Sequence, residues 1–409
     1  MKVAKNILVL TQWSYKDPLI QAYTLPYVKI IARKLPAGSR IHLVTFEQNR
    51  YKMTGAEKKQ AKQYLSSSNI ELLDFSYSPF GLISILKWVG VFAVLLWKVF
   101  TNRIAFIHAW CTTAGSLGYV LSKASGRPLV IDSYEPHAEA MVENGTWSAK
   151  GMKFRILFYF EKKQSRHAMH IVSATEGMRD YARRKYHVEF KHFYVKPACT
   201  DFTEFNLEKK KNPVLLKQLN LADKIVCVYA GKFGGIYLTK EVFDFLKVAE
   251  SHWGSRFRAL VLSSHDPQII LQWSLASGFD LNKLIVRFVP YEQAADYMGL
   301  ADFAITPVKP IPTKRYCTPI KDGEYWALGL PVVITENISD DSEIIEKNNA
   351  GAVIHSLDEN GYKEAIHKIN ELLTNNPESL SKRINSLAHN YRSYAIAEKI
   401  YEKIYSSNS

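Results

Sequence analysis

Cysteine is scarce in this chain, and its few cysteines lie far apart. The 409 residues include only Cys111, Cys199, Cys227 and Cys317. Because they form no Cys-x-x-Cys pair and no Cys/His cluster, the sequence predicts neither a zinc site nor a disulfide framework. Unpaired cysteines are typical of proteins kept in a reducing compartment. We therefore expect a cytoplasmic protein without a bound metal.

Long hydrophobic runs are also absent. The ten uncharged residues between Lys87 and Lys98 would span about 15 Å as a helix, whereas the hydrocarbon core of a bilayer is about 30 Å thick. The segment 79–100 therefore predicts no membrane span. Two alternatives stay open: a helix buried in the N-terminal half of the chain, or an interfacial helix with its tryptophans and lysines at headgroup depth.

The start of the chain has no signal-peptide pattern, because Met1-Lys-Val-Ala-Lys-Asn6 leads directly into an apolar strand. This again favours a cytoplasmic location. Peripheral contact with the inner face of the cell membrane stays open as an addition to it.

Acidic residues are outnumbered by basic ones. The sequence contains 53 Lys and Arg against 39 Asp and Glu, a net charge of +14. Such a surplus suits a polyanionic partner: nucleic acid, anionic lipid headgroups or phosphorylated small molecules. Zinc-finger spacing, RNP-like aromatic motifs and basic heptads are missing, so we expect no nucleic-acid partner. Phosphate-bearing substrates and an anionic membrane surface are favoured instead.

The length and composition predict two globular domains. A chain of 409 residues exceeds what one core usually supports. An apolar content of 47% with 22% charged residues excludes wholesale disorder. The polar and charged run up to Lys209-Lys-Lys-Asn-Pro213 is typical of an exposed linker. We place the boundary near residue 200, which gives domains 1–200 and 201–390.

Short apolar runs alternate with helical segments in both halves of the chain. This order predicts an α/β fold with a parallel, doubly wound sheet in each domain. In the first domain the expected strands are 6–10, 41–46, 103–110, 128–132 and 169–173. In the second they are 224–230, 258–263, 284–289, 302–306 and 332–335.

The stretch Thr318–Thr335 has an unusual pattern. Pro319 and Gly329 bracket a short helix, and a β-branched strand follows. A helix N-terminus has unpaired N–H groups and partial positive charge, so it can bind a phosphate, to which Lys321 would add a full charge. Glu324 lies on the same helix face and can accept hydrogen bonds from sugar hydroxyls. The open alternative is a capped surface helix with a solvated Lys–Glu pair.

A second phosphate-binding pattern begins the second domain. The strand 224–230 leads into Gly231-Lys-Phe-Gly-Gly235. Glycines at such a turn let backbone N–H groups approach a phosphate closely, so Gly231, Gly234 and Gly235 are candidate ligand-binding residues.

Residues 319–333 read Pro-x-Lys-x-x-Glu-Tyr-x-Ala-x-Gly-x-Pro-Val-Val. This pattern resembles the nucleotide-sugar-binding signature of GT-B fold, retaining, Leloir-type glycosyltransferases (the group 1 or family 4-like enzymes). The resemblance implies two Rossmann-like domains facing a cleft, with the helix 391–409 packed back on the first domain. It also implies that Glu324 binds the ribose of the donor and that Lys321 lies near its diphosphate. Thr318, Pro319 and Ile320 belong to the same implied donor-binding segment.

The glycine-rich turn resembles the Gly-Arg-Leu segment of that family, with Lys232 at the basic position that contacts the diphosphate. Lys232 and Lys321 would then stabilise the leaving diphosphate without a metal or another cofactor, the donor being the nucleotide diphosphate sugar itself. The chain departs from the family at Tyr237, where a second lysine is common. It also departs at Tyr316-Cys-Thr318, where relatives carry a second glutamate. The identity of the sugar stays open.

The acceptor side is expected after the strand 128–132, because ligands of open α/β sheets bind beyond the carboxyl ends of strands. Asp132, Glu135 and His137 are the candidates there. In the resembled family a histidine or acidic residue of this loop faces the transferred sugar, which implies a catalytic role for His137. The alternative is a histidine satisfied within an exposed loop.

The sequence thus predicts transfer of a sugar from a nucleotide diphosphate sugar to a hydroxyl of a glycan or lipid-linked acceptor, with retention, in bacterial surface polysaccharide or lipid-linked glycan synthesis. Two alternatives stay open. A GT-B fold epimerase would turn over a nucleotide sugar without an acceptor. A non-catalytic polyanion- or polysaccharide-binding protein would show steep salt dependence and no nucleotide pocket.

Overall fold

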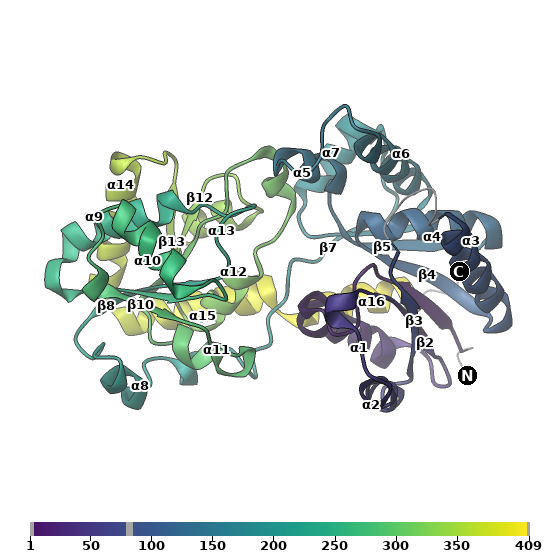
Figure 1. The fold of residues 1–409 in the computed structure, drawn as a ribbon, viewed down its shortest axis with the longest axis horizontal. Helices are drawn as coiled ribbons and strands as arrows, with labels where there is room; N and C mark the ends of the chain where they lie inside the picture. Colours follow the sequence, from purple (N-terminus) through teal and green to yellow (C-terminus); the bar gives the residue numbers. More distant parts are fainter. Residues whose placement is uncertain (1–3, 79–84, 407–409) are drawn as a thin grey trace. The chain divides into compact units, whose positions relative to one another are not determined.

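The computed structural model describes residues 4–78 and 85–406. The chain divides into two compact units (Figure 1). Unit 1 comprises Met1–Lys196 and Ala395–Ser409, and unit 2 comprises Pro197–Tyr394. Residues 79–84 of the hydrophobic segment 79–100 lie outside the described residues.

Unit 1 is built on a seven-stranded parallel sheet in the order β3-β2-β1-β4-β5-β6-β7. The strands are β1 (Asn6–Leu10), β2 (Ile41–Glu47), β3 (Ile70–Ser76), β4 (Ile104–Trp110), β5 (Leu129–Tyr134), β6 (His170–Ser173) and β7 (Phe193–Val195). The chain proceeds outward from β1 to β3 and then returns to place β4 beside β1. The order therefore reverses between β1 and β4.

The helices of unit 1 connect these strands. They are α1 (Leu25–Lys34), α2 (Gly55–Ser66), α3 (Ile85–Thr101), α4 (Cys111–Ser125), α5 (His137–Glu143), α6 (Met152–His167), α7 (Gly177–Tyr186) and the final helix α16 (Tyr394–Ser406). A π-helical turn, η1 (Leu19–Thr24), precedes α1. Pro26 follows it at the start of α1 and has no N–H to donate, so one continuous α-helix cannot form here. No helix of the described chain combines the length and apolarity needed to cross a bilayer.

A buried polar cluster attaches α16 to the sheet of unit 1. Asp132 on β5 is fully buried, and its carboxylate lies 3.2 Å from Lys196 Nζ. It also accepts a hydrogen bond of 2.7 Å from the Tyr401 hydroxyl. Burial opposes the charge on Asp132, but Lys196 and hydrogen bonds from His108 and Tyr401 outweigh it and hold its pKa at about 2. A second tyrosine of α16, Tyr405, hydrogen-bonds His108 Nδ1 at 2.5 Å.

Unit 2 contains a six-stranded parallel sheet in the order β10-β9-β8-β11-β12-β13. Its strands are β8 (Ile225–Ala230), β9 (Phe257–Leu262), β10 (Leu284–Arg287), β11 (Phe303–Thr306), β12 (Val332–Thr335) and β13 (Gly351–Ile354). Its longer helices are α8 (Pro213–Gln218), α9 (Lys240–Trp253), α10 (Pro267–Ala276), α11 (Tyr291–Met298), α12 (Ile320–Ala327), α13 (Asp341–Lys347), α14 (Glu359–Thr374) and α15 (Pro377–Arg392).

The alternation of side chains along β8 creates two cores in unit 2. Val226 and Val228 point into a cluster with residues of α12 and α15. Cys227 and Tyr229 point into the opposite cluster, with residues of α9 and α14. Because both faces of the strand are covered, β8 consists of consecutive apolar residues, as is typical of parallel strands in doubly wound folds.

Substitution of Tyr401 tests the attachment of α16. Tyr401→Phe is expected to lower the free energy of unfolding by about 1–3 kcal/mol, because the buried Asp132 carboxylate loses a donor. The midpoint of chemical denaturation measures this loss. Tyr391→Phe, at a tyrosine that is 40% exposed, is the matched control. Equal midpoints for the Tyr401→Phe and wild-type proteins would contradict the role of this hydrogen bond.

Candidate functional site

Unit 2 brings the two predicted phosphate-binding segments to one edge of its sheet. β8 and β11 are parallel neighbours, so their carboxyl ends, Ala230 and Thr306, lie at the same edge. From β8 the chain builds β9 and β10 on one side of the sheet, and β11 then begins the other side. Ligands of open α/β sheets bind at such a reversal. The segments 231–239 and 307–319 both start there.

These two segments are hydrogen-bonded to each other. Tyr237 forms an antiparallel bridge with Val308, and the Leu238 N–H donates to the Pro307 carbonyl at 2.8 Å. The helix α12 also contacts this region. Its Tyr325 hydroxyl accepts a hydrogen bond of 2.9 Å from the N–H of Ala230, the last residue of β8. Hydrogen bonds therefore connect the segment after β8, the segment after β11 and α12.

The glycine-rich turn leaves Lys232 exposed. Gly234 and Gly235 have φ angles of 76° and 61°, a region that favours glycine, so the turn depends on them. The Phe233 N–H donates to His265 Nε2 at 3.1 Å, which holds the middle of the turn. Lys232 forms no ion pair with any residue that the structure describes. Its ammonium group is therefore available to an anionic ligand.

The first turn of α12 contains a partly exposed cation, Lys321, paired with a nearly buried carboxylate, Glu324. Pro319 precedes the helix and its first N–H groups have no side-chain cap. Lys321 forms an ion pair with Glu324, and the exposed fractions of their side chains are 34% and 5%. Because Glu324 is so strongly buried, the alternative of a solvated surface pair does not fit.

Two further basic residues near these segments already have partners. Lys240 Nζ lies 2.6 Å from Asp244, and Arg315 lies 3.4 Å from Glu343. Lys321 is also paired, with Glu324, but it lies in the first turn of α12, so we keep Lys232 and Lys321 as the candidates for contacts with a diphosphate.

Arg392 positions the segment before α12, and sequence reasoning missed it. Its side chain is 1% exposed, and Nη1 donates to Thr318 Oγ1 at 2.6 Å. Its Nη2 forms an ion pair with the buried Asp341. No local pattern signals this contact, because Thr318, Asp341 and Arg392 lie in three separate segments of the chain.

A second carboxyl group lies beside Asp341. Burial, together with the nearby Asp341, raises the pKa of Asp322 well above its usual range. Asp322 thus interacts with Asp341, and the Thr306 hydroxyl donates a hydrogen bond to Asp322 Oδ1. The end of β11, the first turn of α12 and Arg392 are thus joined by one buried polar chain.

Removal of the Arg392 guanidinium tests this arrangement. Arg392→Met is expected to cost about 3–5 kcal/mol of unfolding free energy, because Asp341 would keep a buried charge without its partner. Chemical denaturation measures the loss. Arg383→Met is the matched control, since Arg383 is exposed on the same helix and bonds only backbone carbonyls. Similar losses for the two variants would show that the buried pair has no special role.

In unit 1, Glu135 and His137 lie together at the surface. His137 Nδ1 is 3.5 Å from Glu135 Oε1, and their side chains are 31% and 30% exposed. Asp132 does not lie with them. β5 continues to Tyr134, beyond the predicted end of the strand, and Asp132 is held inside by Lys196 and Tyr401. The structure therefore separates Asp132 from Glu135 and His137, and of the three acceptor-side candidates it leaves only these two at the surface.

A buried carboxyl group supports the helix turn that carries His137. Glu161 on α6 accepts the Ala138 N–H at 3.0 Å and the Thr112 hydroxyl at 3.1 Å. Its second oxygen accepts the Tyr186 hydroxyl at 2.9 Å. Burial raises the pKa of Glu161 to about 7, although these hydrogen bonds and the charge of His137 oppose the rise.

The raised pKa predicts a pH-dependent stability. The pKa of Glu161 is 4.5 in the unfolded chain and about 7 in the folded protein. Between these pH values the unfolded chain has lost the proton of Glu161 while the folded protein keeps it. The free energy of unfolding therefore falls by about 3 kcal/mol as the pH rises. Glu161→Gln, which imitates the neutral acid, is expected to gain that amount relative to wild type between pH 4.5 and pH 8. Denaturation at both pH values measures it. Glu176→Gln, at an exposed glutamate, should leave the wild-type pH dependence unchanged.

The described residues, 4–78 and 85–406, contain no group of three or more His, Cys, Asp or Glu side chains arranged to hold a metal ion.

Sequence comparison finds one family match. Residues 312–403 match the family model of the Glucosyltransferase 3-like, C-terminal domain. This region contains the segment 318–324 and Arg392. No curated protein matches the chain.

Solved structures show the fold over the whole chain. HepE from Anabaena, in complex with UDP, is 15% identical, with a TM-score of 0.72 and coverage of 98% of this chain and 100% of that one. Sucrose-phosphate synthase from Thermosynechococcus elongatus is 14% identical, with a TM-score of 0.69 and coverage of 98% and 99%. A candidate UDP-N-acetylglucosamine 2-epimerase from Listeria monocytogenes is 10% identical, with a TM-score of 0.56 and coverage of 97% and 94%. The predicted α/β, GT-B fold is confirmed.

Proposed function

We propose that this chain is a glycosyltransferase that moves a sugar from a nucleotide diphosphate sugar to a hydroxyl acceptor. The observation that carries the proposal is the edge of the unit 2 sheet where β8 and β11 end. There the exposed Lys232 and the helix N-terminus with Lys321 offer positive charge, and Glu324 offers a carboxylate. The match of residues 312–403 to a glucosyltransferase-like domain supports this assignment.

The donor-binding residues divide by chemistry. Lys232 and Lys321 would contact the diphosphate, and the backbone N–H groups of Ile320, Gly234 and Gly235 would add hydrogen bonds. Thr318 and Pro319 would shape the approach to α12. Glu324 would accept hydrogen bonds from the ribose hydroxyls, which requires those hydroxyls to share or replace its contact with Lys321.

The reaction places negative charge where these cations lie. The bond between the sugar and the phosphate oxygen breaks, its electron pair goes to the diphosphate, and the acceptor oxygen forms the new bond and loses its proton. Lys232 and Lys321 would stabilise the charge on the leaving group, so the reaction as proposed requires no metal. His137, oriented by Glu135, would position the reacting sugar or the acceptor hydroxyl.

The finer assignments are also proposals. A uridine diphosphate sugar is the first donor to test, since the similar HepE structure contains UDP. Retention is supported by the resemblance of residues 319–333 to retaining enzymes. We place the reaction in the cytoplasm, with a glycan or lipid-linked acceptor of bacterial surface polysaccharide or lipid-linked glycan synthesis.

Nucleotide binding tests the donor site. Calorimetry with UDP, GDP, ADP and dTDP is expected to show selective binding of one nucleotide. Lys232→Ala, Lys321→Ala and Glu324→Ala should each weaken it about tenfold to a hundredfold, because each removes a charge-assisted contact. Lys347→Ala, at an exposed lysine of unit 2, is the matched control and should bind as wild type does. Absence of binding by the wild-type protein, or binding indifferent to all three variants, would refute the donor site.

Turnover separates this function from an epimerase of the same fold. A glycosyltransferase releases the nucleoside diphosphate in proportion to acceptor consumed, whereas an epimerase converts the nucleotide sugar without acceptor. Measuring the two products with and without added acceptor therefore decides between the reactions. A non-catalytic binder would give neither product.

A further inference from the structure

The outer face of α3 exposes a long apolar stripe. Exposed fractions are 81% for Leu86, 57% for Val89, 62% for Trp97 and 53% for Phe100. These positions are spaced by three, eight and three residues, so they lie on one side of the helix. On the opposite side, Leu95 and Val99 are fully buried. Of the two alternatives for this segment, a helix buried in the N-terminal half of the chain does not fit the outer side of α3.

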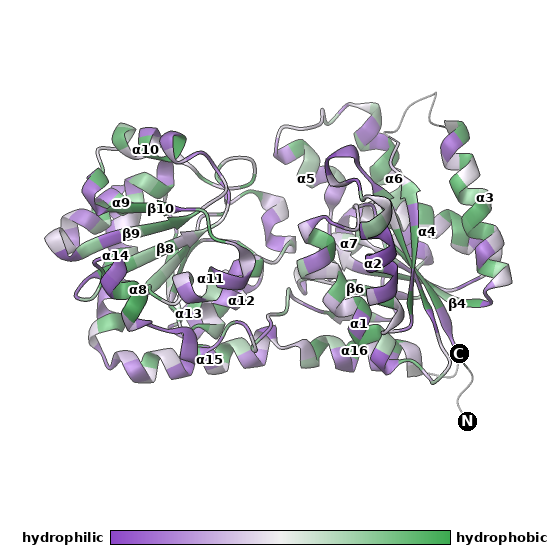
Figure 2. Ribbon diagram, turned by 60° about the horizontal axis from the view of Figure 1, so that its bottom comes forward, coloured by the Kyte–Doolittle hydropathy of each residue, from purple (hydrophilic) through white to green (hydrophobic). Residues whose placement is uncertain are grey.

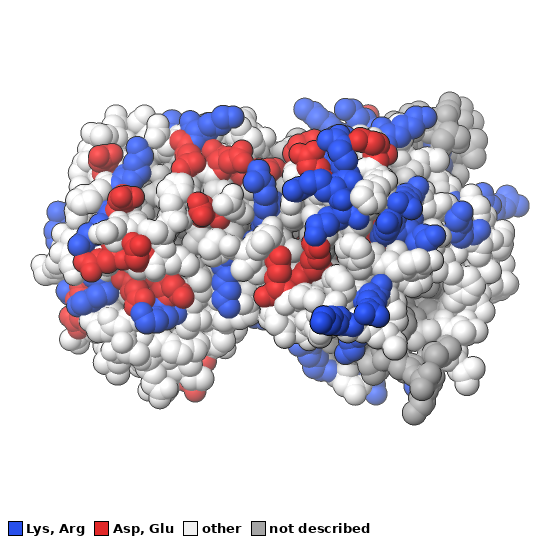
Figure 3. Space-filling view, turned by 90° about the horizontal axis from the view of Figure 1, so that it is seen from above, with Lys and Arg blue, Asp and Glu red and all other residues white. Residues whose placement is uncertain are grey.

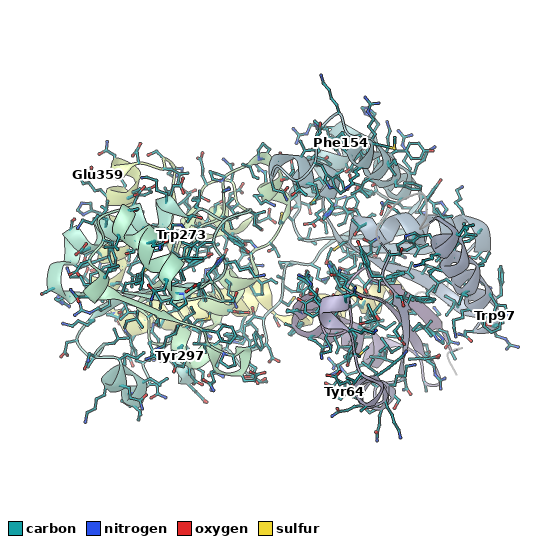
Figure 4. The ribbon with its side chains drawn as sticks, viewed as in Figure 1. Tyr64, Trp97, Phe154, Trp273, Tyr297 and Glu359 are labelled. Carbon is teal, nitrogen blue, oxygen red and sulfur yellow. The ribbon has the colours of Figure 1, made fainter. Side chains whose placement is uncertain are left out.

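We call this stripe the α3 face: Leu86, Val89, Trp97 and Phe100. Figure 2 colours most of α3 as hydrophobic although the helix lies at the outside of unit 1. In Figure 4, Trp97 extends outward from α3 and away from the sheet of unit 1. A contiguous exposed apolar surface of this kind marks an interaction site in a folded protein.

A second stripe of exposed apolar residues lies on α6. α3 and α6 both pack against α4. On α6, Met152 is 76%, Ile156 46% and Tyr159 54% exposed, again on one helical side. Val120 of α4, 37% exposed, lies on the helix between them.

The charge of the chain is concentrated in the unit that carries this surface. Unit 1 contains 31 of the 53 Lys and Arg residues and 15 of the 39 Asp and Glu residues, a net charge of +16. Unit 2 contains the remaining 22 basic and 24 acidic residues, a net charge of −2. Figure 3 shows this difference on one face of the molecule, where Lys and Arg gather over unit 1, the right-hand part.

Basic residues also border the α3 face itself. Lys87 is exposed, and Lys98 lies eleven residues further along the same helical side, where it is 24% exposed and its Nζ lies 4.0 Å from Glu71. Arg103 is exposed just beyond the end of the helix. A helix with an apolar face and flanking cations is typical of segments that lie in the headgroup region of a bilayer.

We propose that the α3 face docks unit 1 onto a bilayer containing anionic lipid. The 17 residues of α3 span about 25 Å, which is shorter than the hydrocarbon core, so the helix would lie in the plane of the interface. Trp97 and Phe100 would enter the boundary between headgroups and acyl chains, while Lys87, Lys98 and Arg103 would contact lipid phosphates.

The charge favours a bilayer over a second copy of the chain. Two units of +16 would repel each other if they met through the α3 face, whereas an anionic surface attracts them. This surface lies outside the donor and acceptor residues, so the proposal does not depend on the proposed function.

Vesicle flotation of the full chain tests the docking surface. The probes are phosphatidylcholine vesicles with and without about one third phosphatidylglycerol, at low and high salt. Wild-type protein is expected to float with the anionic vesicles and to be released by salt. Trp97→Ser should reduce the bound fraction about tenfold, and Lys87→Glu should reduce it on anionic vesicles alone. If Trp97→Ser fails to fold, the Lys87→Glu variant decides by itself.

Matched controls lie on unit 2. Phe288→Ser changes an aromatic residue that is 72% exposed, and Lys217→Glu changes an exposed lysine. Both should float as wild type does. Equal binding to neutral and anionic vesicles, no binding to either, or wild-type binding by Trp97→Ser would overturn the proposal.

If the vesicle-binding test fails, two further measurements identify the reason. A lipid-free dimer in analytical ultracentrifugation that Trp97→Ser dissociates would assign the α3 face to a second copy instead. Calorimetry with UDP separates the two proposals. Protein that binds nucleotide but no vesicle overturns the docking surface alone, and protein that binds vesicles but no nucleotide overturns the proposed function alone.

Discussion

The candidate site in unit 2 depends on the buried ion pair between Arg392 and Asp341. An arginine in the interior is tolerated only when its charge is paired. Here Asp341 pairs the charge, and Thr318, which stands just before α12, accepts a hydrogen bond. The backbone also packs closely, since a Cβ on Gly323 would lie 2.3 Å from Thr200 Oγ1. The position of Lys321 and Glu324 at the sheet edge therefore depends on a residue at the end of α15.

Unit 1 also has a buried ion pair at its boundary with unit 2. Lys196 is its last residue before the chain enters unit 2, and its ammonium group is fully buried beside Asp132. Arg392 lies just before the chain returns to unit 1. Both crossings between the units are thus anchored by a buried cation paired with a carboxylate. Such pairs add little net stability but are costly to break, so they fix the chain path at these two points.

Much of the fold was predictable because its signals are local. The apolar runs that predicted β1, β8 and β12 correspond to strands in the structure, and the pattern Thr318–Thr335 does form a helix followed by a strand. The failures involve partners that are distant in sequence. β5 extends beyond Asp132 and turns its carboxylate toward Tyr401, which lies 269 positions later. The sequence around Thr318 does not predict its contact with Arg392. The apolar pattern of α3 likewise does not predict which side of the helix stays exposed.

The order of the chain has a consequence for how the protein is made. Unit 2 is contiguous, whereas unit 1 consists of Met1–Lys196 and Ala395–Ser409. The first segment of unit 1 therefore leaves the ribosome before unit 2, but unit 1 stays incomplete until α16 emerges, because Tyr401 and Tyr405 supply contacts to Asp132 and His108. Domains generally fold as units during synthesis. In this chain the synthesis of unit 1 begins before that of unit 2 but ends after it. Unit 2 can therefore fold while the core of unit 1 still lacks α16.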